Sequence, residues 1–168
     1  NRSKLENMRM ENHGIEDGLP DAVMEDLTLK MKASRERVQI ILEKLWESRG
    51  RNRSLMDDLE IDLEDEVRSD PCSAYSPFSV VGTRTEHEGA MLLWHLCSLG
   101  CSFQLILRVH FENEDACQFR HRVSQTFPLH EACKSKCDVA TIKFLAKQFP
   151  LAREQRDEHM NHPLHEVL

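Results

Sequence analysis

The chain has 168 residues, of which 40% are hydrophobic and 6% aromatic, enough for one modest core with a satellite and too little for a large enzyme. Its net charge of −7 lies in residues 1–88, which hold 13 Lys and Arg against 20 Asp and Glu, while residues 89–168 hold 9 of each. A nucleic-acid partner is not expected, because such binding rests on clustered Lys and Arg and this acidic chain has no sustained basic stripe.

No apolar stretch approaches the roughly 20 residues that span a bilayer, and the N-terminal residues lack the apolar core of a signal peptide. We therefore expect a chain that does not insert into a membrane and that works inside the cell, in the cytoplasm or the nucleus. Because the chain begins with Asn1 and stops at Leu168 within an expected helix, the sequence leaves open that it is a piece of a longer protein.

Residues 1–20 are polar and show no apolar period, so we expect a flexible N-terminal segment there. From Asp21, a candidate N-cap, apolar residues recur every three or four positions and predict an amphipathic helix over residues 21–48. These apolar residues are Met24, Leu27, Met31, Val38, Ile41 and Leu45, interrupted by Ser34.

The same spacing resembles nearly three coiled-coil heptads, so residues 21–48 are a candidate oligomerisation, docking or capping element. Two parallel copies would place like charges against each other across the seam, which disfavours a parallel homodimer and favours an acidic partner surface. The basic flanking residues are Lys30, Arg35, Arg37 and Lys44.

Residues 49–88 supply an acidic candidate for that surface. Leu55, Leu59, Leu63 and Val67 form an i, i+4 stripe among seven acidic residues, which suggests that residues 55–68 fold back on residues 21–48 as a helical hairpin. The alternative is that the acidic run is simply solvated. Residues 69–88 are rich in Ser and Pro and are expected to be a linker.

An internal repeat dominates residues 89–168. The sequence Phe-Pro-Leu-His-Glu-Ala at 127–132 returns as His-Pro-Leu-His-Glu-Val at 162–167, a displacement of 35 residues, and a further step of 35 from His130 reaches His95. The expected helix that ends at Phe149 has an apolar face, and a matching apolar face lies 36 residues earlier in the chain. A slip of one residue inside the repeat reconciles the two spacings.

This pattern resembles the ankyrin repeat, whose unit of about 33 residues opens with Thr-Pro-Leu-His-x-Ala and folds into two antiparallel helices. The resemblance covers residues 89–168, with an incomplete last repeat. It departs from the family where Gln125 and Met160 replace the turn glycine and where Phe127 replaces the threonine before proline. The residues expected to build the repeats are Trp94, His95, Pro128, Leu129, His130, Ala132, Ile142, Leu145, Pro163, Leu164 and His165.

The expected fold is therefore all-α: a short ankyrin-like solenoid of helix pairs, preceded by a long amphipathic helix and by disordered or acidic segments. Each helix pair needs a neighbour to cover its apolar face, and about three units are normally needed for stability. Either more repeats follow the chain, or the helix at 21–48 covers an open end.

Site chemistry is sparse in the sequence. Cys97 with Cys101, and Cys133 with Cys137, have the spacing of one helix face, but no set of four ligands with zinc spacing completes them, and reduced structural thiols are expected. No Gly-rich phosphate loop or paired catalytic carboxylates are recognisable, so we expect no enzyme activity, no metal and no cofactor.

The resemblance implies a non-enzymatic scaffold or adaptor that binds other proteins. The residues proposed for the contact lie near the turns of the repeats: Arg122, Gln125, Asp157, Glu158 and His159. The alternatives are a regulatory ankyrin region of a larger enzyme or channel and, less favoured, a Cys/His metal-binding domain.

Overall fold

The computed structural model describes residues 21–75, 77–78 and 90–167. In these ranges the regular elements are helices, joined by turns and loops, apart from a two-residue antiparallel pair in which β1 (Pro77–Phe78) lies against β2 (Ala90–Met91). The all-α fold class is thereby confirmed. The chain divides into two compact units, residues 1–33 and 34–168. The expectation of a flexible segment at residues 1–20 lies outside the described residues.

Helix α2 (Asp21–Ser48) has the predicted bounds and begins at the residue expected to cap it. In the second unit its buried stripe is Ser34, Val38, Leu42, Leu45 and Ser48. The predicted stripe was wrong in two respects. Ser34 is buried and continues the stripe, and Leu42 rather than Ile41 carries the full burial.

The first unit contributes only the beginning of α2 to the described chain. Leu27 and Met31, predicted to lie on the apolar face, are 46% and 49% exposed. Asp26 and Lys30 form an ion pair of 2.7 Å one helical turn apart, with both side chains exposed. The predicted stripe is therefore buried in residues 34–48 and exposed at these two positions.

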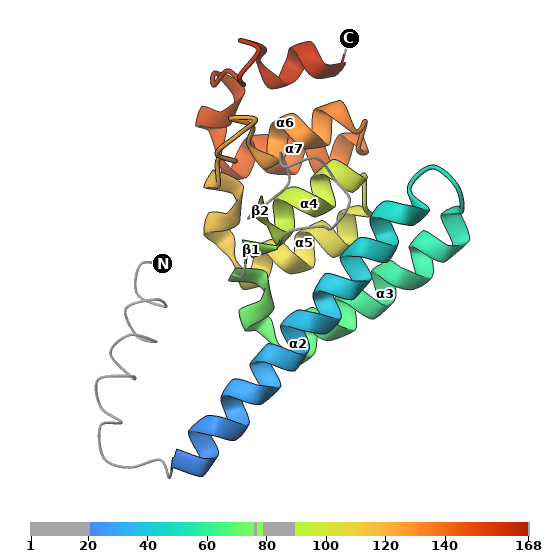
Figure 1. The fold of residues 1–168 in the computed structure, drawn as a ribbon. Coiled ribbons are helices and arrows are strands. Elements are labelled where there is room, and N and C mark those ends of the chain that lie inside the picture. The colour runs from blue at the N-terminus through green and yellow to red at the C-terminus, as the bar shows by residue number, and fades with distance from the viewer. Residues whose placement is uncertain (1–20, 76, 79–89, 168) are drawn as a thin grey trace. The chain divides into compact units, whose positions relative to one another are not determined.

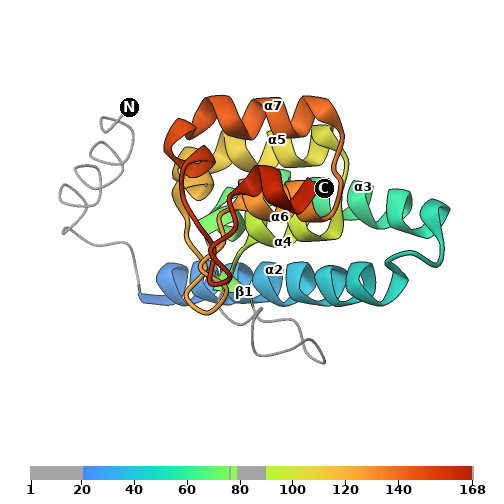
Figure 2. The same ribbon diagram turned by 90° about the horizontal axis from the view of Figure 1, so that it is seen from above.

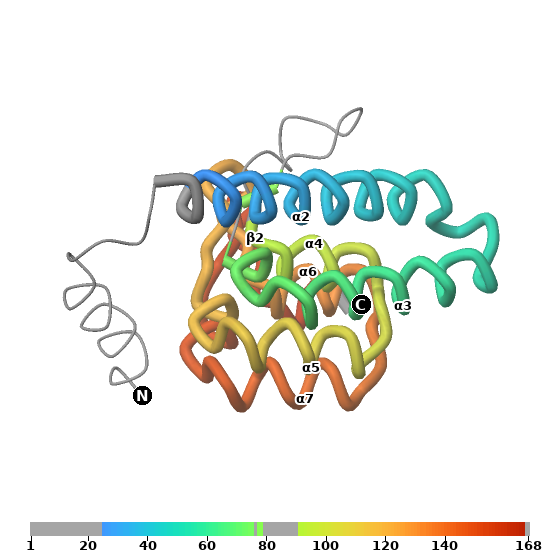
Figure 3. The backbone as a smooth tube through the Cα atoms, turned by 90° about the horizontal axis from the view of Figure 1, so that it is seen from below, coloured from blue at the N-terminus to red at the C-terminus, as the bar shows by residue number. Residues whose placement is uncertain are grey.

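Helix α3 (Arg53–Ser69) is longer than the segment predicted and starts after Asn52, whose side chain accepts a hydrogen bond from Leu55 N. It lies side by side with the second half of α2 (Figure 3). The Arg37 Nε atom donates to Glu66 Oε1 at 2.7 Å, so the predicted hairpin forms between residues 34–48 and α3. Leu55, the first residue of the predicted stripe, is 43% exposed and Met56 is buried in its place.

The acidic residues of α3 are not all solvated, and Glu60 is the exception. It is 6% exposed, and its Oε2 atom accepts a hydrogen bond of 3.0 Å from the backbone N–H of Ser102. Ser102 is the N-cap of α5 (Phe103–Glu112), so a carboxylate of α3 satisfies a backbone donor at the start of another helix.

Part of the predicted linker is also ordered against the core. Pro71–Tyr75 forms the 3₁₀ helix η1, and the hydroxyl of Tyr75 donates to the carbonyl oxygen of Glu112 at 2.6 Å. Asn113 Nδ2 donates to the carbonyl oxygen of Ala74 at 3.1 Å. The linker expectation is wrong for this stretch, while residues 79–89 lie outside the described chain.

Two helix pairs follow, α4 (Leu92–Leu99) with α5 and α6 (Pro128–Lys134) with α7 (Val139–Gln148). Short 3₁₀ helices connect or follow them: η3 (Glu114–Gln118), η4 (Pro150–Arg153) and η5 (Pro163–Val167). Within residues 34–168, the α2–α3 hairpin, the α4–α5 pair and the α6–α7 pair form successive layers (Figure 1). Viewed along this stack, α7 overlies α5 and α6 overlies α4 (Figure 2).

The backbone of the two pairs repeats at 36 residues. Ser102 and Asp138 are both N-caps in extended conformation, and each side chain accepts a hydrogen bond from the N–H three residues later. The turn between the helices has a left-handed residue in both pairs, Gly100 with φ of 73° and Lys136 with φ of 58°. The pairs are therefore two copies of one local structure.

The spacing of 36 residues also holds in α4 and α6, the first helices of the two pairs, and it corrects one equivalence predicted from the sequence. The hydrogen bond from Cys101 N to Leu96 O recurs from Cys137 N to Ala132 O, again 36 residues later. His130 therefore corresponds to Trp94, and the predicted equivalence of His95 with His130 was wrong by one residue.

The one-residue slip lies in the loop between the pairs. The first loop is closed by His121 N donating to Thr126 O, and the second by Asp157 N donating to Asn161 O, one residue shorter. After each loop, equivalent residues of the two repeats are 35 positions apart. Phe127 N donates to His130 Nδ1, and the equivalent His162 N donates to His165 Nδ1, both at 3.3 Å.

Most of the residues predicted to build the repeats lie in the core. Those that are buried are Trp94, His95, Pro128, Leu129, His130, Ala132, Leu145 and Pro163. Ile142 is half-buried and packs against the core, whereas Leu164 is 74% exposed and His165 is exposed. The last two lie in η5, and no further helix pair of the described chain covers η5 as η5 covers α6.

Candidate functional site

The residues proposed for a contact lie in two neighbouring loops, 119–127 and 154–162, together called the loop surface below. The backbone N–H of Glu158 donates to the carbonyl oxygen of Ser124 at 3.1 Å, which places the loops side by side. Arg120 adds a second link, because its Nε donates to Gln125 O at 3.0 Å and its Nη2 donates to Arg156 O at 2.9 Å. The two loops are thus joined by one backbone hydrogen bond and by the Arg120 side chain, whose acceptors are backbone carbonyl oxygens.

A hydrogen-bonded chain supports the loop surface from beneath. Trp94 Nε1 donates to Thr126 Oγ1 at 3.1 Å, Thr126 Oγ1 lies 2.7 Å from Ser124 Oγ, and Ser124 Oγ lies 2.9 Å from His121 Nδ1. Trp94, His121 and Thr126 are buried. Buried polar chains of this kind rigidify the backbone that they join, so the first loop is anchored to the preceding helix pair.

The two turns have left-handed residues at equivalent positions, Gln125 with φ of 55° and Met160 with φ of 65°. These are the positions at which the ankyrin family would place glycine. A side chain is kept there at a cost in backbone strain of about 1–2 kcal/mol. Met160 is 61% exposed, so its strained position presents an apolar side chain to solvent.

Four of the five predicted contact residues are accessible. Arg122, Glu158 and His159 are exposed, and Gln125 is half-buried. Asp157 is only 7% exposed. Its Oδ1 atom accepts hydrogen bonds from the N–H of His159 at 2.9 Å and of Asn161 at 2.8 Å, so Asp157 holds its own turn and its assignment as a contact residue was wrong.

Sequence reasoning missed three residues of the loop surface. Val123 and Met160 are 48% and 61% exposed and give the surface apolar contact area beside its charges. Arg120 ties the loops together, and its ring contact with Phe127, 5.6 Å from guanidinium carbon to ring centroid, orients it. No sequence signal could reveal Arg120, because its partners are backbone carbonyls that any residue supplies.

A cysteine and a histidine meet in the core between α5 and η3. Cys117 Sγ lies 3.4 Å from His110 Nδ1, and both residues are buried. Burial raises the pKa of Cys117 to about 12 and lowers the pKa of His110. The pair is therefore a neutral thiol beside a neutral imidazole, and it lacks the thiolate that nucleophilic catalysis requires.

The remaining buried thiols follow the same rule. Burial raises the pKa of Cys97 and Cys101 well above the usual thiol value and raises the pKa of Cys133 to about 11. Among the described residues no group of three or more Cys, His, Asp or Glu side chains could hold a metal ion. Repetition of these cysteines at the period of the helix pairs fits a packing role.

No helix in the described part of the chain is both long enough and apolar enough to cross a membrane. No protein-family model matches the chain, and comparisons with curated proteins and with solved structures found no match either. The repeated helix pairs and the geometry of the loop surface are therefore the features that bear on function.

Proposed function

We propose that this chain is a non-enzymatic protein-binding scaffold built on ankyrin-like helix pairs, with the loop surface as its recognition site. The observation that carries the proposal is the repetition of caps and left-handed turns at 36 residues, together with the bond between Glu158 N and Ser124 O that sets consecutive loops in a row. Stacked repeats create extended surfaces of this kind, and such surfaces serve recognition.

The composition of the loop surface supports a protein partner. It combines exposed apolar side chains, Val123 and Met160, with exposed charged and polar ones, Arg122, Glu158 and His159. Protein interfaces pair an apolar centre with a polar rim and favour arginine and methionine. Hydrogen bonds already order the backbone of the two loops, so binding a partner would cost less conformational entropy than ordering a flexible loop.

The α2–α3 hairpin is assigned the role of a cap for the stack in this proposal. It forms the layer before α4–α5, and its Glu60 satisfies the first turn of α5. Terminal repeats need an outer face that is polar, and the acidic residues of α3 supply one.

The test uses the full chain with a photo-crosslinking amino acid at Val123 or at Met160, and at Val139 of α7 as the matched control. All three positions are apolar and exposed, at 48%, 61% and 64%. A partner that binds the loop surface is expected to crosslink from the first two positions and not from the third.

Two double variants that replace exposed residues by Glu test the same site by affinity, and the control variant adds the larger negative charge. Replacing Arg122 and His159 by Glu is expected to weaken binding of the crosslinked partner at least tenfold, while replacing Lys143 and Lys147 of α7 by Glu is expected to leave it unchanged. Equal losses from both variants, or crosslinking from position 139 alone, would exclude the loop surface. Asp157 is left intact, because it holds the second turn.

A further inference from the structure

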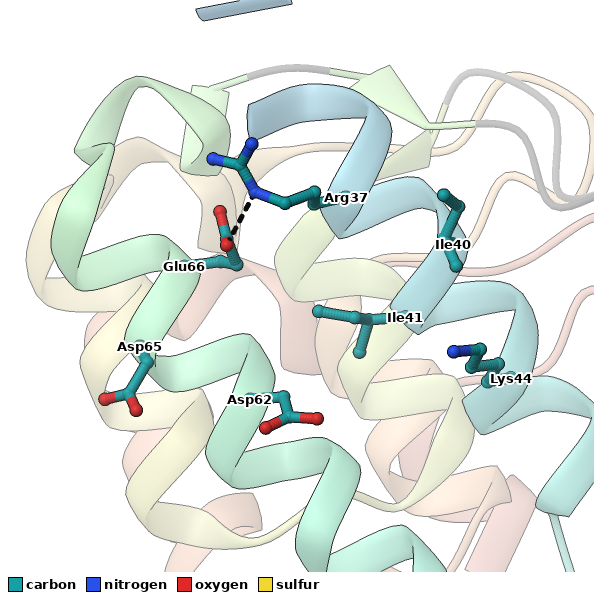
Figure 4. Close-up of a pocket in the computed structure, with 7 residues that line it drawn as sticks. All are labelled: Arg37, Ile40, Ile41, Lys44, Asp62, Asp65 and Glu66. Atoms are coloured by element: carbon teal, nitrogen blue, oxygen red, sulfur yellow. Dashed lines mark hydrogen bonds and ion pairs between the residues drawn. The ribbon is translucent and has the colours of Figure 1, made fainter. Parts of the chain in front are cut away.

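A groove between α2 and α3 opens to solvent on the hairpin. It has a volume of about 370 Å³. Helix α2 lines one wall and α3 the other (Figure 4). The lining residues are Arg37, Ile40, Ile41 and Lys44 from α2 and Asp62, Asp65 and Glu66 from α3.

The two walls carry opposite charge. The wall of α2 is basic and the wall of α3 is acidic, and the ion pair of Arg37 with Glu66 joins them at one end of the groove (Figure 4). Further along, Lys44 and Asp62 stand on opposite walls (Figure 4), and neither side chain forms a hydrogen bond or ion pair with another described residue. The charges of one wall are thus only partly neutralised by those of the other.

Two apolar side chains of α2 also line the groove. Ile41 is half-buried at the edge of the core and is directed toward α3, and Ile40 is 49% exposed on the side of α2 away from α3 (Figure 4). An exposed isoleucine beside basic and acidic side chains has the layout of an interface seam, in which apolar residues are flanked by pairing charges. A partner helix with charges of only one sign would place like charges against one of the two walls of the groove.

We propose that this groove is a homodimer interface occupied by the α2–α3 hairpin of a second copy of this chain. A two-fold axis parallel to the helices places α2 of each copy over α3 of the other, so each basic wall meets an acidic wall and Ile40 enters the seam. The product is a four-helix bundle with closed two-fold symmetry. This arrangement differs from parallel pairing of two α2 helices, in which basic residues would face each other.

The charge pattern is self-complementary at matched heights along the hairpin. Arg37 pairs with Glu66 within the chain, so in an antiparallel hairpin Lys44 stands near residues 58–62. The two-fold operation therefore brings Lys44 of one copy near Asp62 of the other, twice per dimer. The interface needs no residue outside the described part of the chain.

Sedimentation velocity of the full chain over a concentration series tests the proposal. The expected result is a concentration-dependent shift to a species of twice the 19.6 kDa chain mass, and weaker association at high salt. A wild-type chain that stays monomeric throughout the series overturns the proposal. A dimer whose dissociation constant does not change with salt concentration also overturns it.

Charge-swap variants then locate the interface. Lys44→Asp alone and Asp62→Lys alone each replace attraction by repulsion at two symmetric contacts, so each is expected to weaken association by about tenfold or more. The double variant restores opposite charges between the copies and is expected to recover most of the wild-type affinity. A double variant as weak as the singles overturns the proposed pairing.

Matched controls separate association from folding. Lys143→Asp places the same charge change on the exposed face of α7 and is expected to leave the dissociation constant unchanged. Circular dichroism and urea unfolding of each variant check that the hairpin remains folded. A dimer that survives both single variants but is lost in Lys143→Asp would place the interface elsewhere and overturn the proposal.

Discussion

At the scale of single residues, this chain buries several titratable groups. Glu131 is 4% exposed in α6, close to Thr126 and Ser98, and desolvation raises the pKa of its carboxyl group. His130 beside it is 1% exposed, and burial lowers the pKa of its imidazole. Both residues thus favour their neutral forms in the folded chain, and folding stability must depend on pH.

The contribution of Glu131 has a definite sign. Because its pKa is raised on folding, the folded chain binds more protons above about pH 4.5, and stability from this group is lost as pH rises through that window. We expect Glu131→Gln to gain stability over the wild type on going from about pH 4 to about pH 8, because only the wild type loses the contribution of the buried carboxyl group. Urea unfolding at both pH values measures the difference.

The buried histidines do not disturb this comparison. The lowered pKa values of His110 and His130 make stability fall as pH drops through about 6.5, in the opposite sense, but both proteins contain them and their effect cancels. A stability difference between Glu131→Gln and the wild type that is the same at both pH values would contradict the burial of a charged carboxylate.

At the scale of elements, several of the contacts that define the fold lie at the ends of helices. The second helix of each pair starts with a side-chain cap, from Ser102 in α5 and Asp138 in α7. Helix α5 has an additional acceptor, because Glu60 of α3 accepts from Ser102 N. This contact joins the hairpin layer to the first helix pair through a helix terminus, where a negative charge is also favoured by the helix dipole.

Removal of this acceptor should destabilise the chain. Glu60→Ala leaves the half-buried Ser102 N–H without its partner, and we expect a loss of about 1 kcal/mol in the free energy of unfolding. Glu60→Gln keeps an acceptor and should cost less. Asp58→Ala, an exposed change on the same helix, is expected to stay within about 0.5 kcal/mol of the wild type.

Urea unfolding followed by far-UV circular dichroism provides the three values. An equal loss for Glu60→Ala and Asp58→Ala would mean that helix propensity or net charge, rather than the contact with α5, dominates.

At the scale of the molecule, the hairpin of residues 34–69 and the helix pairs share one hydrophobic core. Leu42 and Leu63 from the hairpin belong to the same buried cluster as Leu93, Leu96 and other residues of the pairs. Layers of repeats are stabilised through their interfaces with neighbouring layers. Loss of packing in one layer should therefore lower the stability of the next layer.

The two tryptophans allow this coupling to be measured, since Trp46 lies in the hairpin and Trp94 in the first pair. In a Trp46→Phe background, fluorescence reports on Trp94 alone. We expect Leu63→Ala, which removes a fully buried side chain, to lower the stability reported by Trp94 by about 2–5 kcal/mol, in step with circular dichroism.

Leu164→Ala is the control, because this leucine is 74% exposed and the change should cost less than about 0.5 kcal/mol. If Leu63→Ala leaves the Trp94 transition where it was, the hairpin and the pairs unfold independently and the cap assigned to α2–α3 is wrong.

Several features were predictable from local pattern alone. The bounds of α2, the Asp138 cap of α7 and the proline start of α6 follow from apolar spacing and from the residue types at these helix starts. The hairpin was predicted as well, and Leu59, Leu63 and Val67 of its predicted stripe are buried. Leu55 is exposed and Glu60 is buried, because the face of α3 that packs depends on where α5 begins.

The candidate site was predictable to a similar degree. The repeat located both loops, and the missing turn glycines at Gln125 and Met160 marked the left-handed positions. The burial of Asp157 could not be read from the chain, because an aspartate in a turn is equally able to face a partner or to bond its own backbone.

The amino-acid sequence by itself determined which segments are helical and that residues 89–168 repeat, because helix caps and apolar periodicity act within a few residues of one another. Only the tertiary structure decided the true equivalence of His130 with Trp94, the capping of α5 by Glu60 and the meeting of the two loops. The last two depend on contacts between residues more than 30 positions apart, whose partners are often backbone atoms common to every residue.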